Sequence, residues 1–338
     1  MSIQLGELQL RNPVFLAPMS GISDEPFRDM AHANGAGLVV SEMVASRELV
    51  EARPDMVRRA KGAGRVQPFA MQLAGRETRW MSEGAKFAQD LGADIIDINM
   101  GCPARTVTGG LSGSALMRDL DHAVTLIEAT VAAVHVPVTL KMRLGWDAHS
   151  MNAPELARRA EAAGVAMITV HGRTRCQFYT GKADWAAIRA VRETIRIPLI
   201  ANGDVSSVGD ARTILAQSGA DGVMIGRGAY GRPWWPGVIA NMLVPGSGIP
   251  KPGLATEYYL LARHHEKILT FYGEAQGNRI ARKHLGWAVQ RKLETGHVTP
   301  VEAQAWRQAM LQTSDNRQAE AALREFYMRL QDCSEKAA

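Results

Sequence analysis

The stretches AMITVH (166–171), IPLIAN (197–202) and DGVMIG (221–226) are short apolar runs that each close on a polar residue or a glycine. They are the last of eight such runs, which alternate with alanine-rich stretches of helical character. This alternation is typical of repeated βα units around a parallel sheet. Eight units favour closure into a (β/α)8 TIM barrel over an open doubly wound sheet, which is the alternative. The earlier runs are PVFLAP (13–18), GLVVSE (37–42), VQPFAMQL (66–73), DIIDIN (94–99) and VTLKMR (138–143).

Capping and turn signals divide the chain. Helix starts are predicted at Asp24 and Asp184. After Val244 the segment PGSGIPKPG has the composition of a linker, and only helical patterns follow it, including the capping box of 299–302. We therefore expect a catalytic barrel over residues 1–244, a linker over 245–253 and a small all-α helical domain over 254–332.

The composition is that of an ordinary folded protein, with 338 residues, 46% hydrophobic and 22% charged. No apolar run is long enough to span a bilayer and no signal-peptide pattern opens the chain, so we expect a cytoplasmic protein with no membrane partner. We also expect a monomer. Cys102, Cys176 and Cys333 lie far apart without a CxxC pair, which predicts free thiols and no metal site. The net charge of +5 permits a polyanionic partner without requiring one.

The residues that close the runs are the first candidates for a site, because TIM barrels carry their chemistry at the carboxyl ends of the strands. Nearly every run closes on a polar residue, so we expect one polar mouth. In chain order the candidates are Met19 after Pro18, Glu42, Gln72, Asn99, Lys141 with Arg143, His171 with Arg173, Asn202 with Asp204, and Gly226 with Arg227.

The last two closures, NGD (202–204) and GRG (226–228), place glycines and a cation where such barrels bind phosphate through backbone N–H groups. Either motif alone is more simply a tight turn. Their occurrence at successive strand ends favours the phosphate site.

Lys141 ends an otherwise apolar strand, where desolvation of a cation is costly unless an anionic group compensates for it. It could form a Schiff base, or it could lie beside a cofactor that becomes anionic on reduction, such as a flavin. A structural salt bridge with Glu42 or Asp97 is the alternative.

Cys102 lies in NMGCP (99–103), directly after the fourth run. A buried cysteine is more often a small hydrophobic residue. Here Gly101 and Pro103 fix the backbone on either side, and the residue emerges at the mouth. Since a thiol has an ordinary pKa of about 8.5, it can donate a proton to a carbanion or an enolate at neutral pH. We predict that Cys102 is the catalytic acid and assign no chemistry to the other cysteines.

Six strings in order resemble the motifs of the tRNA-dihydrouridine synthases, and a seventh extends the resemblance into the helical region. They are APM (17–19), NMGCP (99–103), KMRLGW (141–146), HGRT (171–174), ANGD (201–204), IGRG (225–228) and ARKHLGW (281–287). The subgroup that the chain resembles is the bacterial DusB type. The resemblance implies FMN as cofactor, NADPH as reductant and a D-loop uridine of tRNA, at position 17, as substrate.

The resemblance also implies a mechanism and site roles. Hydride passes from N5 of FMN to C6 of the uracil, and Cys102 protonates C5. Asn99 orients the base or only holds its own loop. The ring system of the cofactor contacts Pro18, Met19, Ser20, Gln72, Lys141 and His171, and its ribityl phosphate contacts Asn202, Gly203, Asp204, Gly226 and Arg227.

Contacts to tRNA are expected from two regions. In the DusB type the loop after NMGCP commonly carries several basic residues, whereas here Arg105 is followed by the uncharged segment 106–110. The stretch 279–292 contains no acidic residue and five basic ones. An ordinary solvated basic face is the alternative for that stretch. The predicted RNA contacts are Arg143, Arg173 and Arg175 near the mouth, with Arg279, Arg282 and Lys283 on one helical face.

Three other functions fit parts of the pattern. An FMN-dependent barrel reductase of a free pyrimidine, similar to dihydroorotate dehydrogenase, would have no use for a basic helical domain. A flavin-free Schiff-base lyase would depend on Lys141 and would be colourless. A non-catalytic RNA-binding protein would not depend on Cys102.

Overall fold

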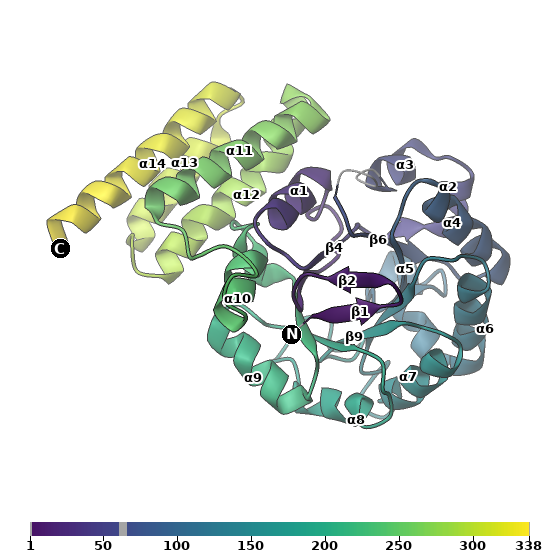
Figure 1. The fold of residues 1–338 in the computed structure, drawn as a ribbon. Helices are drawn as coiled ribbons and strands as arrows, with labels where there is room; N and C mark the ends of the chain where they lie inside the picture. The colour runs from purple at the N-terminus through teal and green to yellow at the C-terminus, as the bar shows by residue number, and fades with distance from the viewer. Residues whose placement is uncertain (1, 61–65, 338) are drawn as a thin grey trace.

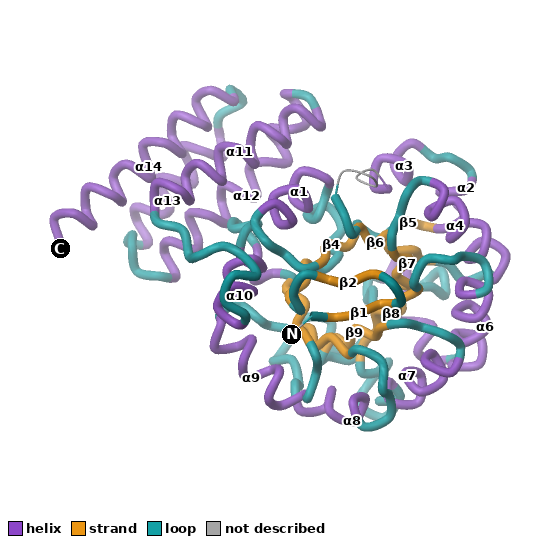
Figure 2. Tube along the Cα trace, in the orientation of Figure 1, coloured by secondary structure: helices purple, strands orange, loops and turns teal. Residues whose placement is uncertain are grey.

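Strand pairing closes the larger part of the molecule into a barrel. The structure is a computed structural model that describes residues 2–60 and 66–337, with side chains as far as residue 333. Eight parallel strands surround the axis, and the circle closes because β4 pairs with β6 as well as with β3 (Figure 2). The strands are β3 (Val14–Leu16), β4 (Leu38–Val40), β6 (Phe69–Ala74), β7 (Ile95–Met100), β8 (Val138–Arg143), β9 (Met167–His171), β10 (Leu199–Asn202) and β11 (Gly222–Ile225). Each predicted run contains one of them, and the predicted TIM barrel is confirmed.

The outer helices follow the strands around the barrel (Figure 1). They are α1 (Glu25–Ala33), α2 (Ser46–Val50), α3 (Pro54–Ala60), α4 (Thr78–Asp90), α5 (Arg105–Thr108), α6 (Leu120–Val131), α7 (Ala153–Ala162), α8 (Arg189–Arg192), α9 (Val208–Ser218) and α10 (Trp235–Leu243). Asp24 caps α1 as predicted by accepting a hydrogen bond from the Phe27 N–H. The helix predicted to start at Asp184 is a 3-10 turn over Ala186–Ile188 that continues into α8, and Arg192 bonds the carbonyl groups of Ile195 and Ile197 beyond its end.

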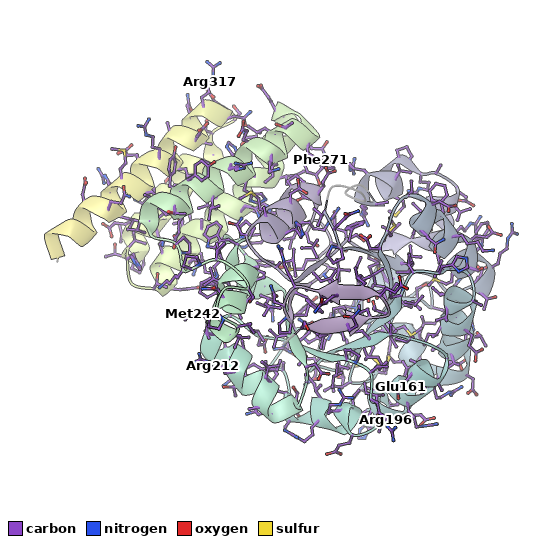
Figure 3. All side chains as sticks on the ribbon, in the orientation of Figure 1. Glu161, Arg196, Arg212, Met242, Phe271 and Arg317 are labelled. Carbon is purple, nitrogen blue, oxygen red and sulfur yellow. The ribbon has the colours of Figure 1, made fainter. Side chains whose placement is uncertain are left out.

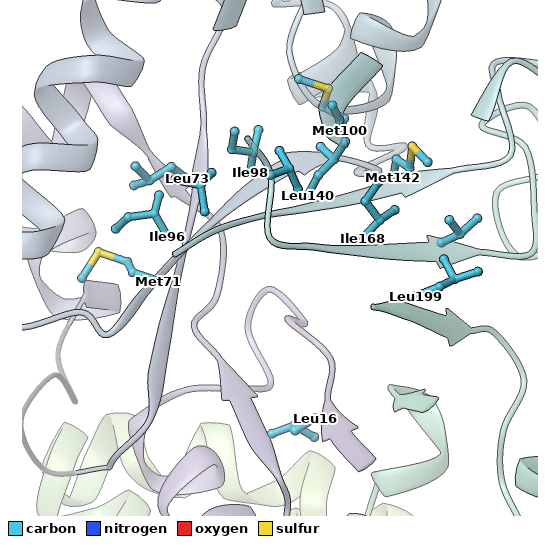
Figure 4. Close-up of a cluster of buried hydrophobic side chains, with 14 of the residues drawn as sticks. Leu16, Met71, Leu73, Ile96, Ile98, Met100, Leu140, Met142, Ile168 and Leu199 are labelled. Carbon is cyan, nitrogen blue, oxygen red and sulfur yellow. The ribbon is translucent and has the colours of Figure 1, made fainter. Parts of the chain in front are cut away.

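Side chains alternate between the two faces of the barrel strands. On β8, Val138, Leu140 and Met142 point outward and join the hydrophobic layer beneath the helices, to which the other strands also contribute (Figure 4). Thr139, Lys141 and Arg143 occupy the alternate positions and therefore face inward. The outward positions hold the helices by burial of apolar surface, which leaves the inward positions at the carboxyl ends free to be polar.

A hairpin at the N-terminus covers the other end of the barrel. Strands β1 (Ile3–Leu5) and β2 (Leu8–Leu10) pair antiparallel and lie across the barrel opening in Figure 1. Ile3, Leu5 and Leu10 pack in one cluster with inward-facing residues from the starts of the strands. The amino end of the barrel is thus filled by apolar side chains. A two-residue strand, β5 (Val44–Ala45), pairs with the end of β6.

A helical bundle lies beside the barrel (Figure 1). It consists of α11 (Leu254–Tyr272), α12 (Glu274–Glu294), α13 (Pro300–Gln312) and α14 (Asn316–Ala337). Its core is a second hydrophobic cluster that includes Met30 of α1 and Val238 of α10, so the bundle packs on that side of the barrel. The predicted capping box at Thr299 is confirmed. The domain limits stay a prediction, although α11 begins directly after the predicted linker. None of the described helices is long and apolar enough to cross a membrane.

Candidate active site

The carboxyl ends of the strands open into a cavity of about 970 Å³. It brings together side chains from across the barrel, from the loops that follow the strands, and from α12. Most of the residues predicted from the strand ends line it. These are Pro18, Met19, Ser20, Gln72, Asn99, Cys102, Lys141, Arg143, His171, Asn202, Gly203, Asp204, Gly226 and Arg227.

A chain of hydrogen bonds fixes the amide of Gln72 on the cavity wall. Gln72 Nε2 donates to Asp97 Oδ2 (2.7 Å), and its Oε1 accepts from Asn99 Nδ2 (2.7 Å). Thr139 Oγ1 donates to the other oxygen of Asp97 (2.6 Å). Strand register places Asp97 between Gln72 and Thr139 on adjacent strands. Burial raises the pKa of Asp97 to about 6 against the lowering effect of these bonds. The Asp97 side chain is buried behind Gln72 and supports the cavity wall without lining it.

Lys141 extends into the cavity and donates to Asn202 Oδ1 (3.2 Å). Among the described residues no carboxylate lies within ion-pair distance of it. Glu42 instead accepts from the Gly21 N–H (2.5 Å) and Asp97 from its neighbours, so the salt-bridge alternative does not describe this lysine. Burial, and then the charge of Arg143, lower the pKa of Lys141 to about 8. The cavity therefore holds a cation that an anionic ligand would stabilise.

His171 lies beside Lys141 at the end of the neighbouring strand and is neutral. Burial and then the positive charges of Lys141 and the nearby arginines lower its pKa well below the ordinary value. Its Nε2 lies 3.4 Å from Arg173 Nη1, and because a guanidinium can only donate, this contact favours the tautomer with the proton on Nδ1. Such a neutral imidazole can donate one hydrogen bond to a ligand in the cavity.

The loop of Cys102 is held from both sides. Asn99 Oδ1 accepts from the N–H groups of Gly101 (3.2 Å) and Cys102 (3.0 Å). The Cys102 carbonyl accepts from Ser114 Oγ (2.8 Å), and the Gly101 carbonyl accepts from Arg143 Nε (2.8 Å). Cys102 is partly exposed and lines the cavity. The thiol is therefore fixed at the mouth rather than packed in the core, while Asn99 uses its amide oxygen to hold this loop.

Two loops with open backbone donors lie at the far end of the cavity. Among the described residues, nothing accepts from the backbone N–H groups of Gly203, Asp204, Gly226 or Arg227. Gly203 has a φ of +123°, and a Cβ there would lie 2.9 Å from the His171 ring, so glycine is required at this turn. Free N–H groups beside a cationic side chain form a suitable cradle for a phosphate.

Asp204 is the centre of an ion-pair cluster rather than a free ligand. Its Oδ1 accepts from Arg173 Nη1 and from Arg227 Nη2, both at 2.9 Å. Its Oδ2 accepts from Arg173 Nη2 (2.6 Å) and the Ala183 N–H (2.8 Å). Partial burial alone would raise the pKa of Asp204, but these bonds and charges lower it. The Asp204 carboxylate therefore holds Arg227 and its loop in place, and only the backbone N–H of Asp204 is open to a ligand.

Arg173 and Arg143 are both buried, at 1% exposure, so their predicted contact with an RNA backbone needs revision. Arg173 bonds Asp204 and the carbonyl groups of Thr180 and Gly181, which engages its donors within the chain. Arg143 bonds the carbonyl groups of Thr174 (2.9 Å) and Phe178 (2.8 Å). Only Arg143 reaches the cavity, where burial lowers its pKa to about 10 and leaves it charged at neutral pH.

The predicted basic face of α12 is divided by packing. Arg279 is exposed, but Arg282 Nη2 donates to the Thr313 carbonyl (2.9 Å), and Lys283 Nζ contacts the Gly21 carbonyl. Lys292 is buried and pairs with Glu257 (2.5 Å). Of the three residues predicted to form one RNA-binding face, Arg279 is exposed, whereas Arg282 and Lys283 are partly buried and bond carbonyl groups within the chain. Arg175, near the mouth, stays a candidate because its partly exposed guanidinium lies over the rings of Trp146 and Phe178.

Several cavity residues were missed by the sequence reasoning. Tyr179, which is 52% exposed, lies at the mouth with the guanidinium groups of Arg143 and Arg227 at 5.4 and 4.8 Å from its ring centre. An aromatic residue in the loop directly after HGRT is a signal that could have suggested it. Trp287, Gln290, Arg291 and Glu294 of α12 also line the cavity, and no strand-end pattern could have indicated them.

Comparison with known proteins identifies the family. The model of the family described as Dihydrouridine synthase (Dus) matches residues 15–332. The chain belongs to the dihydrouridine synthase family. A probable tRNA-dihydrouridine synthase from Rhizobium leguminosarum bv. phaseoli is 61% identical over 84% of this chain and 87% of its own length. A tRNA-dihydrouridine synthase B from Xanthomonas axonopodis pv. citri is 46% identical over 84% of this chain and 86% of its own length. The predicted family is confirmed, and the predicted subgroup occurs among these relatives.

Solved structures of distant sequence share the barrel. Morphinone reductase in complex with tetrahydroNAD superposes with a TM-score of 0.52 at 16% identity, over 76% of this chain and 93% of that chain. TcOYE with pHBA superposes with a TM-score of 0.52 at 13% identity, over 78% of this chain and 97% of that chain. At this identity the likeness concerns the fold alone.

Proposed function

We propose that this member of the dihydrouridine synthase family is a flavin-dependent oxidoreductase that reduces a uridine of tRNA to 5,6-dihydrouridine. The observation that carries the proposal is the position of Cys102, which lines one cavity with Gln72, Lys141 and His171 on a loop held by Asn99 and Arg143. Relatives named tRNA-dihydrouridine synthase support the substrate.

The residues of the cavity fit FMN. The open N–H groups of the 203–204 and 226–227 loops, with the Arg227 guanidinium, would hold its phosphate. Gln72, Lys141 and His171 would bond its ring system, and Lys141 would favour an anionic state of the ring because burial makes an uncompensated cation costly there. Pro18, Met19 and Ser20 would line one side of the ring.

Reduction adds a hydride and a proton across the C5–C6 double bond of the uracil. When bound, FMN supplies the hydride for C6, with NADPH as the reductant. Cys102 would give its proton to C5, where negative charge develops, from a loop that the bonds of Asn99 and Ser114 hold at the mouth. Since a base inside an RNA stack cannot reach the cavity, the uridine must leave the stack and enter the mouth. Tyr179 offers an aromatic face at that entrance.

The finer assignments follow the subgroup. We propose position 17 of the D-loop as the target, on the likeness to a synthase B, and a monomeric cytoplasmic enzyme that meets tRNA there. Arg279 is exposed and Arg175 is partly exposed near the mouth, and we propose these two residues as phosphate contacts. A reductase of a free pyrimidine stays the rival function, and a helical bundle packed beside the mouth favours the RNA substrate over it.

Mass mapping of reduced uridines in tRNA from a strain lacking the gene tests the proposal. We expect loss of one D-loop dihydrouridine, restored by the wild-type gene and not by a Cys102→Ala gene. Unchanged tRNA in the deletion strain, with the purified yellow protein reducing a free pyrimidine, would establish the rival. A purified protein without flavin absorbance would instead exclude both flavin-dependent functions.

A further inference from the structure

One wall of the cavity comes from the helical bundle. Trp287, Gln290, Arg291 and Glu294 line it from α12, next to the GRG loop. These four residues occupy one face of the last two turns of the helix, and we call them the α12 wall. The site is therefore built by both parts of the molecule.

Arg291 of the α12 wall bonds the backbone of the GRG loop directly. Its Nη2 donates to the Arg227 carbonyl (3.0 Å) and its Nε to the Tyr230 carbonyl (3.3 Å). Glu294 orients the guanidinium by accepting from Nη1 (2.8 Å). One side chain from the bundle thus fixes two carbonyl groups of the segment that carries Arg227.

Close packing supports these bonds. The rings of Tyr230 and Trp287 stack at 4.0 Å with an interplanar angle of 18°. Gly231 has a φ of +70°, and a Cβ there would lie 2.5 Å from the Ala288 nitrogen and 2.6 Å from the Trp287 carbonyl carbon. The backbone after the GRG loop therefore touches the backbone of α12, which only glycine permits at this position.

The same segment is tied to the other phosphate loop. Arg227 Nη2 bonds Asp204, and Arg232 donates to the carbonyl groups of Ser206 (2.7 Å) and Gly228 (2.8 Å). Contacts therefore run without a break from α12 through residues 227–232 to residues 204–206. A shift of α12 would move both loops whose open N–H groups face the cavity.

We propose that the α12 wall is part of the cofactor site, with Arg291 as a positioning residue that holds the phosphate-binding loops for FMN. This rests on the proposed function, in which those loops bind the cofactor phosphate. Because binding energy is reciprocal between coupled sites, FMN in turn stabilises the docking of α12 on the barrel. The helical bundle then has a second role besides contacting RNA, since its docked position depends on whether the cofactor is bound.

FMN titration of the flavin-free full-length protein, followed by quenching of flavin fluorescence, tests the role of Arg291. We expect Arg291→Gln to weaken FMN affinity about tenfold, since two hydrogen bonds to the loop are lost. Glu294→Gln keeps those bonds and should weaken it about twofold. Arg317→Gln is the matched control, because this exposed arginine points away from the molecule in Figure 3. The FMN affinity of this variant should equal that of the wild type.

Wild-type affinity in a folded Arg291→Gln protein would overturn the inference, whereas a wild-type protein that binds no FMN would overturn the proposed function itself. If Arg291→Gln does not fold, the Glu294→Gln titration decides, and affinity equal to that of Arg317→Gln overturns the inference. Hydrogen exchange of the wild-type protein gives a second readout. FMN should slow exchange in residues 284–294 and leave α14 unchanged, and equal exchange in residues 284–294 with and without FMN would contradict the proposed coupling.

Discussion

The barrel mouth and helix α12 were each predicted to gather polar side chains at one place, yet the two predictions had different outcomes. At the mouth, side chains from all around the sheet converge on one cavity. Along α12, Arg279, Arg282 and Lys283 occupy neighbouring positions of one helix and make three different contacts. The carboxyl ends of parallel strands meet because closure of the sheet requires it, whereas the surroundings of a helix face depend on what packs against the helix.

The most severe test of the mouth is Cys102→Ala. Loss of a positioned general acid should lower turnover of tRNA about 10²- to 10⁴-fold and leave bound flavin in place. The measurement is single-turnover conversion of uridine with the flavin spectrum recorded in parallel. Cys176→Ala, at an exposed position outside the cavity, is the control and should retain full turnover. An equal loss of turnover in both variants would show that Cys102 is not the proton donor.

Arg173→Met tests whether the mouth depends on its buried ion pair. Asp204 would lose its bidentate partner and keep Arg227 and the Ala183 N–H, so we expect the free energy of unfolding to fall by about 2–4 kcal/mol. Urea unfolding of the flavin-free protein measures this. Arg175→Met provides a comparison two residues away, where no carboxylate is paired among the described residues, and should cost about 1 kcal/mol or less. If the two variants lose the same free energy of unfolding, the ion pair of Arg173 with Asp204 does not stabilise the mouth as we expect.

Lys141→Met should stabilise the flavin-free protein by about 1–2 kcal/mol at pH 7, because it removes a desolvated cation, while FMN affinity falls. The folded-state pKa of about 8 lies below the ordinary value, so between pH 8 and about 10.5 the unfolded chain binds more protons. Wild-type stability should therefore rise with pH across this window relative to the variant. Urea unfolding of both proteins at pH 7 and pH 10 tests this direction. If the stability advantage of Lys141→Met over the wild type grows with pH, the prediction is wrong.

The smallest effect is expected on α12. Arg279→Gln should raise the KM for tRNA about two- to fivefold. It should also reduce the slope of log affinity against log salt concentration by about one, as expected for the loss of one phosphate contact. Arg282→Gln should affect stability more than KM, because its guanidinium bonds the Thr313 carbonyl within the bundle. Initial rates at two salt concentrations separate these outcomes. A larger effect on KM at Arg282 would show that the predicted basic face acts as a unit after all.

The barrel and much of its site were predictable because they follow from periodicity and topology. Apolar runs locate the strands, and the residue that closes a run faces the mouth when the sheet is closed. Lys141, His171 and Asn202 were found in this way. The same reasoning could not show that Asp204 is shared by Arg173 and Arg227, since that depends on the exact path of three loops.

The contribution of α12 to the cavity was not predictable from the sequence. Helical periodicity indicates which residues share a face of the helix. What packs against that face depends on the tertiary structure. The basic residues from Arg279 to Lys292 looked like one surface, although Lys292 is buried against Glu257 and Arg291 bonds the GRG loop. The close approach of Gly231 to α12 joins residues far apart in the chain and leaves no pattern in the sequence.

The hairpin of β1 and β2 has a kinetic consequence. Since its leucines and Ile3 fill the amino end of the barrel, the electron donor and the RNA must both come in by the carboxyl side. Under the proposed function, a nicotinamide and a uracil would need the same surface of the bound flavin and would exclude one another. Turnover should then alternate, with the oxidised donor departing before the nucleic acid arrives, and double-reciprocal plots should give parallel lines.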